Sequence, residues 1–474
     1  MVEELLRFNA VLRFAVFLAF LSFSNGAALS SDADIPTNAQ YFNTKTRYQD
    51  FNTYLRENIL AINISAVKPP APTCTPVHFT IIARHGTRFP TAENIKKIAA
   101  FDDLVKTEAN GDLSYLSELK AWKMWYKEDM AGHLTETGRE DHIHLAQRMV
   151  ETFPSLLTKE NLQGGRVKFI TSSVPRCINS TLSFQLGLKE WFHLEGSVLV
   201  GIAGVEFPYT VNDTLMRFFA SCERFVETVL NNPEAAIQAT LFKNGPEMET
   251  VQRKVADLLQ IPYDKFTADL AETGFYLCAY EWTIRGLNSP WCRLYDRADA
   301  EVVDYASDLG LYYKRGYGHK IDSMASCVLF NDLFNRLEKA ANEFRAGQPV
   351  SEVVTVEIGH AETLLPLVTL LGLFKDKTPL TADNYASQLN RAFNSGHIVP
   401  YIGNLLAALY DCPDGFRLQL RVNERPVEVP GLDEFSPLFK DVKEQYQQIL
   451  GCNQEISEKR VINSSIKELE SQPY

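Results

Sequence analysis

The chain has 474 residues, of which 45% are hydrophobic and 22% are charged, and its formal net charge is -12. These values are typical of a globular protein with a large core, either one large enzyme body with an insertion or two to three domains. The acidic balance argues against a nucleic-acid partner, because affinity for a phosphate backbone rests on an excess of Lys and Arg.

The N-terminus has the pattern of a secretory leader. Residues 14–23 form an apolar run of ten, which follows Arg7 and Arg13 and precedes small residues. This length fits the central region of a signal peptide and is too short to span a bilayer. We predict a signal peptide over residues 1–28 and no later membrane span. A short membrane anchor or a buried N-terminal helix is the alternative interpretation.

Cysteines and glycosylation sequons agree with the secretory pathway. Eight cysteines can form up to four disulfides in an oxidising compartment, and the sequence alone leaves their connectivity open. Candidate N-glycosylation sites begin at Asn63, Asn179, Asn212 and Asn463. The C-terminal residues SQPY resemble neither an ER-retrieval signal nor a lipid-anchor signal. We expect the protein in the ER lumen, outside the cell or at the cell surface.

Three short β-branched runs predict buried strands. Residues 30–72, which are polar and flanked by prolines, read as a connector before the first run. The runs are residues 77–83, 166–170 and 353–358, and each is followed by polar residues and then by a helical pattern. This order predicts an α/β sheet with its site outside the carboxyl ends of the strands.

The stretch between the second and third strands is poor in strand signals. Apolar residues recur at helical spacing over 212–231, 246–260 and 322–346. We predict a mainly helical insertion domain over residues 200–340, inside an α/β catalytic domain formed by residues 29–199 and 341–474. Residues 416–428 alternate and contain Asn423-Glu424, which predicts a late hairpin.

The first strand ends in the segment Arg84-His85-Gly86-Thr87-Arg88-Phe89-Pro90, which places an imidazole between two guanidiniums. Arg binds phosphoryl oxygens through paired N–H groups, and a neutral imidazole can attack phosphorus. The neighbouring cations favour the neutral ring, because a further positive charge beside them is unfavourable. Gly86 permits a close backbone approach.

This segment resembles the signature of the histidine acid phosphatases, the second branch of the histidine phosphatase superfamily. Two further segments resemble the same family: 171–176, with Ser180 and Phe184, and Gly359-His360-Ala361-Glu362-Thr363. His-Ala-Glu, where most of the family has His-Asp, resembles the multiple inositol polyphosphate phosphatases. The resemblance implies a phosphoglycerate mutase-like α/β sheet flanked by helices, and no metal or other cofactor.

The resemblance also implies roles for six residues. His85 would be the nucleophile and Glu362 the proton donor, while the phosphate-binding residues would be Arg84, Arg88, Arg176 and His360. An alkoxide is a poor leaving group, so a protonated carboxyl must lie beside it. The implied substrates are small polyphosphates, namely inositol polyphosphates and, as a further possibility, 2,3-bisphosphoglycerate.

Other cations could bind the outer phosphates of such a substrate. Lys314 and Arg315 precede Gly316-Tyr317-Gly318, which resembles a basic element of the inositol polyphosphate branch; the alternative is a solvated turn. Lys96 and Lys97 follow the signature and are equally consistent with an ordinary surface.

The resemblance further implies disulfide pairs, with one cysteine ahead of the signature and another late in the chain. It suggests Cys74–Cys412, Cys222–Cys452 and Cys278–Cys292, which leaves Cys177 with Cys327.

Competing interpretations are a broad-specificity acid phosphatase, a mutase-like phosphotransferase and a non-catalytic phosphate-binding protein on the same fold. The leader and the cysteines argue against a cytosolic mutase, and His-Ala-Glu argues against a general acid phosphatase. The presence of all six residues with implied roles argues against a non-catalytic binding protein.

Overall fold

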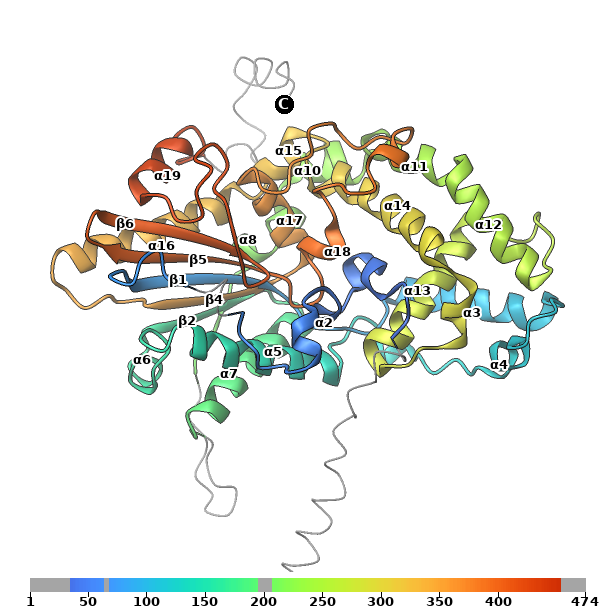
Figure 1. Ribbon diagram of the computed structural model, residues 1–474, viewed down its shortest axis with the longest axis horizontal. Helices are drawn as coiled ribbons and strands as arrows, with labels where there is room; N and C mark the ends of the chain where they lie inside the picture. The colour runs from blue at the N-terminus through green and yellow to red at the C-terminus, as the bar shows by residue number, and fades with distance from the viewer. Residues whose placement is uncertain (1–34, 64–67, 195–206, 453–474) are drawn as a thin grey trace, which may run out of the picture. The chain divides into compact units, whose positions relative to one another are not determined.

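A sheet of seven strands organises the computed structural model, which describes residues 35–63, 68–194 and 207–452 (Figure 1). The strand order across the sheet is β3-β2-β4-β1-β5-β6-β7. The strands are β1 (Thr75–Arg84), β2 (Val167–Thr171), β3 (Thr210–Val211), β4 (Val354–Gly359), β5 (Asn404–Cys412), β6 (Gly415–Val422) and β7 (Arg425–Val427).

The three predicted strands lie side by side and run parallel. In the register of the sheet, Arg84 of β1 stands opposite Gly359 of β4, and Thr171 of β2 stands opposite Ile358. Strands covered on both faces need apolar residues on both, which explains why they appear in the sequence as short continuous runs. The predicted α/β fold is confirmed, and the carboxyl ends of β1, β2 and β4 meet at one edge of the sheet.

Helices cover both faces of this sheet. In the view of Figure 1, α5 (Glu136–Thr152) and α7 (Pro175–Trp191) lie below the sheet, while α17 (Ala361–Leu370) and α19 (Phe439–Gln445) lie above it. Helix α16 (Cys327–Arg345) packs with α19 through Phe334 and Phe439. Helix α6 spans Lys159–Gln163.

A second group of helices lies beyond the edge of the sheet at which the carboxyl ends of β1, β2 and β4 meet (Figure 1). It contains α3 (Ala92–Glu108), α4 (Leu116–Ala121), α11 (Ile237–Lys243), α12 (Pro246–Leu259), α13 (Ala268–Arg285) and α14 (Arg297–Arg315). That residues 200–340 form a separate insertion domain stays a prediction. The short strand β3 lies inside this range and pairs with β2, and the residues described from Pro36 onward form one compact unit.

Two predicted helices of this region are interrupted. The pattern over 212–231 divides into α8 (Asp213–Met216), α9 (Phe218–Ser221), α10 (Glu223–Phe225) and a π-helical turn, and 322–346 divides into α15 (Lys320–Met324) and α16. The backbone of Cys222 is extended, with ψ of 90°, and separates α9 from α10. Among the described residues, no helix combines the length and the apolar character that a membrane crossing requires.

The expectation of a connector over residues 30–72 is wrong for residues 39–56. Residues 39–56 form the short helices η2 (Ala39–Tyr41), η3 (Asn43–Lys45), α2 (Tyr48–Phe51) and η4 (Thr53–Arg56), and the side chains of Phe42 and Leu55 are fully buried. Polar side chains hide this role in the sequence, because Asn43, Asp50 and Asn52 are buried as well. The segment packs against the site described below.

The disulfide pattern differs from the expected one in two pairs. The structure contains Cys74–Cys412 and Cys278–Cys292, as expected, but its third pair is Cys327–Cys452. The expected pairs Cys222–Cys452 and Cys177–Cys327 are therefore wrong, and Cys177 and Cys222 are free and buried. The cause is position: Cys327 begins α16 beside the end of the described chain, whereas Cys177 lies in α7 on the other face of the sheet.

The predicted hairpin is confirmed, since β6 and β7 pair antiparallel around Asn423 and Glu424, which both have positive φ. Arg148 of α5 donates to both carboxylate oxygens of Glu424, at 2.8 Å to Oε1 and 2.9 Å to Oε2, and both side chains are buried. This pair fixes the hairpin to the helices below the sheet.

We predict that Glu424→Ala lowers the free energy of unfolding by about 3–5 kcal/mol, because Arg148 keeps a buried charge without its partner. Chemical denaturation measures this change. Asp414→Ala is the control, since it removes an exposed ion pair with Arg417 and should change stability little. Equal losses of unfolding free energy in the two variants would contradict the stabilising role of the buried pair of Arg148 and Glu424.

Candidate active site

Residues from all three predicted strand ends meet at one edge of the sheet. His85 follows β1 directly, and Arg176 lies in the first turn of α7, just after β2. His360 is the N-cap of α17, directly after β4, and Glu362 lies in the first turn of that helix. The parallel register brings these segments together although up to 278 residues separate them in sequence, from 84 to 362.

The His85 ring is buried and has a defined tautomer. Its Nδ1 lies 2.9 Å from the carbonyl oxygen of Gly86, and because a carbonyl only accepts, Nδ1 carries the proton. Nε2 is left with its lone pair. Burial, followed by the charges of Arg84 and Arg176, lowers the pKa of His85 well below its usual value. The ring is therefore neutral and has a nucleophilic nitrogen.

Close backbone packing holds the loop that carries His85. A Cβ at Gly86 would lie 2.2 Å from the carbonyl oxygen of Gly138 in α5, so this position requires glycine. The Gly86 amide donates a 3.1 Å hydrogen bond to Oγ of Ser180 in α7. The carbonyl of Arg84 lies 3.2 Å from Nε2 of the buried His142. These contacts hold the loop that carries the imidazole in a fixed position.

Three arginines surround this ring. Arg84 donates from Nη1 to the carbonyls of Thr44 (2.5 Å) and Val399 (2.8 Å), and its guanidinium lies 4.6 Å from the Tyr401 ring centroid. Arg88 donates to its neighbour's carbonyl at 2.8 Å, and Arg176 donates from Nη2 to His360 at 3.2 Å.

These arginines lack acidic partners. In the described ranges, none of the three forms an ion pair with a carboxylate, and the buried Nε atoms of Arg84 and Arg176 have no hydrogen-bond acceptor. Gathering unpaired cations costs free energy unless an anion binds among them. The cluster is therefore suited to a phosphate group.

His360 is also neutral and presents a hydrogen-bond donor. Its Nδ1 accepts the bond from Arg176, so its Nε2 carries the proton and donates to Oγ of Ser172 at 3.0 Å. Burial and the neighbouring arginines lower its pKa to about 3. Its ring centroid lies 5.6 Å from that of His85, which places both imidazoles around the same small volume.

Glu362 belongs to the same electrostatic cluster. Burial alone would raise the pKa of its carboxyl, but the nearby His360 ring and the positive charges of Arg315 and Arg84 outweigh burial and lower it. The free protein therefore holds this group as a carboxylate. A bound phosphate adds negative charge beside it and favours the protonated form that a proton donor needs.

The predicted outer cations lie in different surroundings. Arg315 is buried, with its guanidinium 5.3 and 4.9 Å from the ring centroids of Phe219 and Phe225, and it acts on the charge of Glu362. Lys314 is half-buried beside it. Lys96 and Lys97 are exposed on α3, where Lys97 pairs with Glu93 at 3.1 Å.

Several residues at the site were not predicted from the sequence. Ser172 and Ser180 lie within a predicted motif, but their contacts to His360 and Gly86 were not foreseen. Tyr401 is fully buried, with its ring centroid 6.3 Å from that of His85, and its hydroxyl has no hydrogen-bond partner among the described residues. Lys45 comes from the segment for which the sequence predicts a connector. No local pattern marks Tyr401 or Lys45.

Comparison with known proteins agrees with this arrangement. Residues 77–427 match the histidine phosphatase superfamily (branch 2). Multiple inositol polyphosphate phosphatase 1 from Homo sapiens is 41% identical over 434 residues, covering 86% of each chain. The protein of the same name from Gallus gallus is 39% identical, covering 90% of this chain and 94% of its own.

Solved structures share the fold. The multiple inositol polyphosphate phosphatase of Bifidobacterium longum, in complex with inositol hexasulfate, superposes with a TM-score of 0.66 at 15% identity, covering 85% of this chain and 97% of its own. The phytase from D. castellii gives a TM-score of 0.69 at 14% identity, covering 95% of this chain and 96% of its own.

Proposed function

Since the chain belongs to the histidine phosphatase superfamily (branch 2), we propose that it is a phosphomonoesterase that hydrolyses inositol polyphosphates through a phosphohistidine at His85. The observation that carries this proposal is the neutral His85 ring, whose Nδ1 is bonded to a carbonyl and whose surroundings are unpaired arginines.

In the first step, Nε2 of His85 attacks phosphorus and the bond from phosphorus to the substrate oxygen breaks. Arg84, Arg88 and Arg176 donate to the phosphoryl oxygens, and His360 does so as its Nε2–H exchanges Ser172 for a phosphoryl oxygen. These donors stabilise the charge that grows on the phosphoryl group. Glu362 gives its proton to the departing alkoxide. The low pKa of His85 keeps the nucleophile neutral at mildly acidic pH, so this step needs no deprotonation of an imidazolium there.

In the second step, Glu362 accepts a proton from water as the water attacks phosphorus. The bond between phosphorus and Nε2 breaks, inorganic phosphate leaves, and both His85 and the protonated Glu362 are restored. The same carboxyl thus acts as acid and then as base, which suits a group whose charge depends on the phosphate beside it.

The substrate class rests on the named relatives from Homo sapiens and Gallus gallus, which align over most of this chain. The cluster around His85 accounts for one phosphate, and further cations must bind the others. Arg315 and Lys314 stay candidates for such contacts, Arg315 through its position beside Glu362.

Phosphate release from inositol hexakisphosphate, compared with release from a simple alkyl monophosphate, tests the proposal. We expect several phosphates to be released from each inositol hexakisphosphate molecule, and a higher kcat/KM on it than on the monophosphate. Release from the monophosphate alone would favour a broad-specificity acid phosphatase, and release from neither would favour a binding protein.

We also propose that the chain enters the secretory pathway and works in the ER lumen, outside the cell or at the cell surface. The three disulfides support this, because such bonds persist in oxidising compartments. The predicted signal peptide over residues 1–28 and the sequon at Asn463 lie outside the described residues. Glycosylation of Asn63, Asn179 and Asn212 stays a prediction.

A further inference from the structure

A second cation site lies beside the arginine cluster and was not foreseen from the sequence. We infer that Lys45 binds a second phosphate group of the substrate, next to the one held by Arg84 and Arg88. The inference rests on the proposed function, since it names a residue that distinguishes a polyphosphate from a monophosphate.

Lys45 ends the short helix η3, and its ammonium group lies on two aromatic rings of α13. Nζ is 3.4 Å from the ring centroid of Tyr276 and 5.9 Å from that of Tyr280. Tyr280 also neighbours Arg88: although burial opposes it, this tyrosine helps to raise the pKa of the Arg88 guanidinium. Lys45 therefore stands at the edge of the cluster that surrounds His85.

The charge of Lys45 is not neutralised within the protein. In the part of the chain that the structure describes, no carboxylate lies within ion-pair distance of Nζ. The acid that acts on it most strongly, Glu272, is already bound by Lys243 at 2.5 Å and by the Tyr276 hydroxyl at 3.1 Å. An aromatic face alone holds this cation, and an anion would be a much stronger partner.

In the free protein, the charged form of this ammonium group is energetically unfavourable. Burial, reinforced by the charges of Arg88 and Arg84 against the opposing effect of Glu272, lowers the pKa of Lys45 to about 7. A phosphate group placed between these cations would remove the repulsion. The arrangement is unfavourable without a ligand and favourable with one, as in an anion-binding site.

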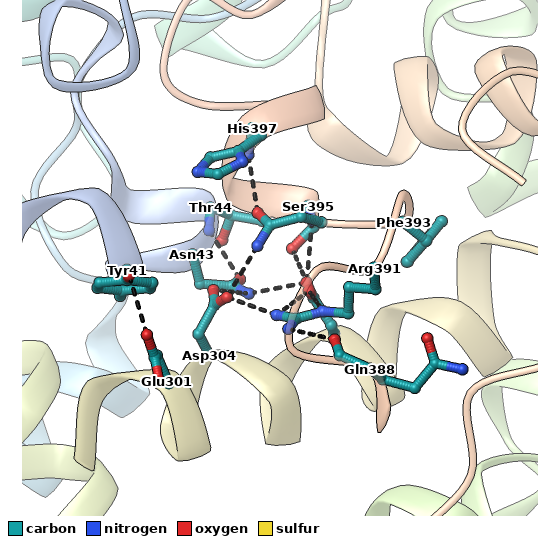
Figure 2. A network of polar contacts seen from close by, with 12 residues as sticks. Tyr41, Asn43, Thr44, Glu301, Asp304, Gln388, Arg391, Phe393, Ser395 and His397 are labelled. Carbon is teal, nitrogen blue, oxygen red and sulfur yellow. Dashed lines mark hydrogen bonds and ion pairs between the residues drawn. The ribbon is translucent and has the colours of Figure 1, made fainter. Parts of the chain in front are cut away.

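A network of polar contacts fixes the backbone that carries Lys45 (Figure 2). Asn43 donates to Asp304 at 3.3 Å and to Asp308 at 3.2 Å, and Arg391 binds the same two carboxylates at 2.5 and 2.6 Å. Ser395 donates a further bond to Asp308. Asn43 has a positive φ of 54°, a conformation that asparagine adopts more readily than most residues.

The same turn is bonded to the catalytic arginine. The carbonyl of Thr44, the residue between Asn43 and Lys45, accepts a 2.5 Å hydrogen bond from Arg84. Lys45 therefore occupies a fixed position relative to the arginines that we propose bind the scissile phosphate. Tyr276 and Tyr280 also line a pocket between α3 and α13, together with Asn94, Lys97 and the acidic residues Asp269 and Glu272.

Lys45→Met tests the inference, because it keeps the stem of the side chain and removes the charge. We expect KM for inositol hexakisphosphate to rise about tenfold, the usual effect of losing one charge-assisted contact. The value of kcat/KM for 4-nitrophenyl phosphate, which has no second phosphate, should change by less than about twofold. Lys45→Arg should restore most of the affinity.

Lys189→Met is the matched control, since Lys189 also lies over an aromatic ring, that of Phe207, but at the far end of α7. This substitution should change neither KM for inositol hexakisphosphate nor kcat/KM for 4-nitrophenyl phosphate. The melting temperature of Lys45→Met should stay the same or rise, because the substitution removes an unpaired cation.

Three outcomes would overturn the inference. Equal losses of kcat/KM on both substrates would place Lys45 at the scissile phosphate. No loss on either substrate would mean that Lys45 only packs on Tyr276. A fall in melting temperature with losses on both substrates would give it a role in folding. A wild-type protein that releases no phosphate from inositol hexakisphosphate would instead refute the proposed function itself.

Discussion

Replacing His85 with alanine is expected to lower kcat by at least about 10⁴-fold, because removing a covalent nucleophile disables the whole sequence of steps. The loss should be similar for inositol hexakisphosphate and for an activated aryl phosphate, since both must transfer phosphate to the same nitrogen. Steady-state kinetics on the two substrates measures it.

The fold of this variant should survive. The ring sits at a strand end among cations that disfavour its charged form, and its one hydrogen bond within the described part of the chain is to the adjacent carbonyl. Circular dichroism and the melting temperature are the controls. A folded variant with more than about a tenth of the normal kcat would show that another residue attacks phosphorus.

Glu362→Gln is expected to have the second largest effect. Glutamine keeps the shape of the side chain but neither donates a proton to the alkoxide nor accepts one from water. Release of inositol alkoxide should therefore slow by about 10²–10⁴-fold. An aryl phosphate with a good leaving group needs little protonation, so its phosphorylation step should slow far less.

The two substrates separate this role from a structural one. With the aryl phosphate, the variant should release one equivalent of phenol rapidly and then stop, because hydrolysis of the phosphoenzyme still needs the base. Pre-steady-state absorbance follows this burst. Equal slowing of the first step on both substrates would move the acid role away from Glu362.

Local sequence patterns identified the part of the fold that forms the site. Strands β1, β2 and β4 are covered on both faces, so they appear as short apolar runs, and each is followed directly by the motif it positions. Parallel pairing of β1 with β4 then brings the segments of His85 and Glu362 together, although they lie far apart in the sequence. The resemblance to a known family supplied roles that the residues by themselves left open.

The features that the sequence did not predict depend on contacts between segments that lie far apart in the chain. Strand β5 is buried through its pairing with β1 and β6, and it was not predicted from the sequence. The helix η3 is built from polar residues, and its Asn43 donates to Asp304 and Asp308 on α14, more than 250 residues away. Cysteine pairing depends likewise on where α16 meets the end of the described chain.

Trapping the phosphoenzyme tests the central claim most directly. Glu362→Gln is mixed with 4-nitrophenyl phosphate and quenched within the burst, and the attached phosphate is located by mass spectrometry under conditions that preserve phosphohistidine. We predict about one phosphate per chain, on His85, at Nε2, because Nδ1 is bonded to the Gly86 carbonyl. A burst without phosphate on His85, or phosphate on a different residue, would contradict the account.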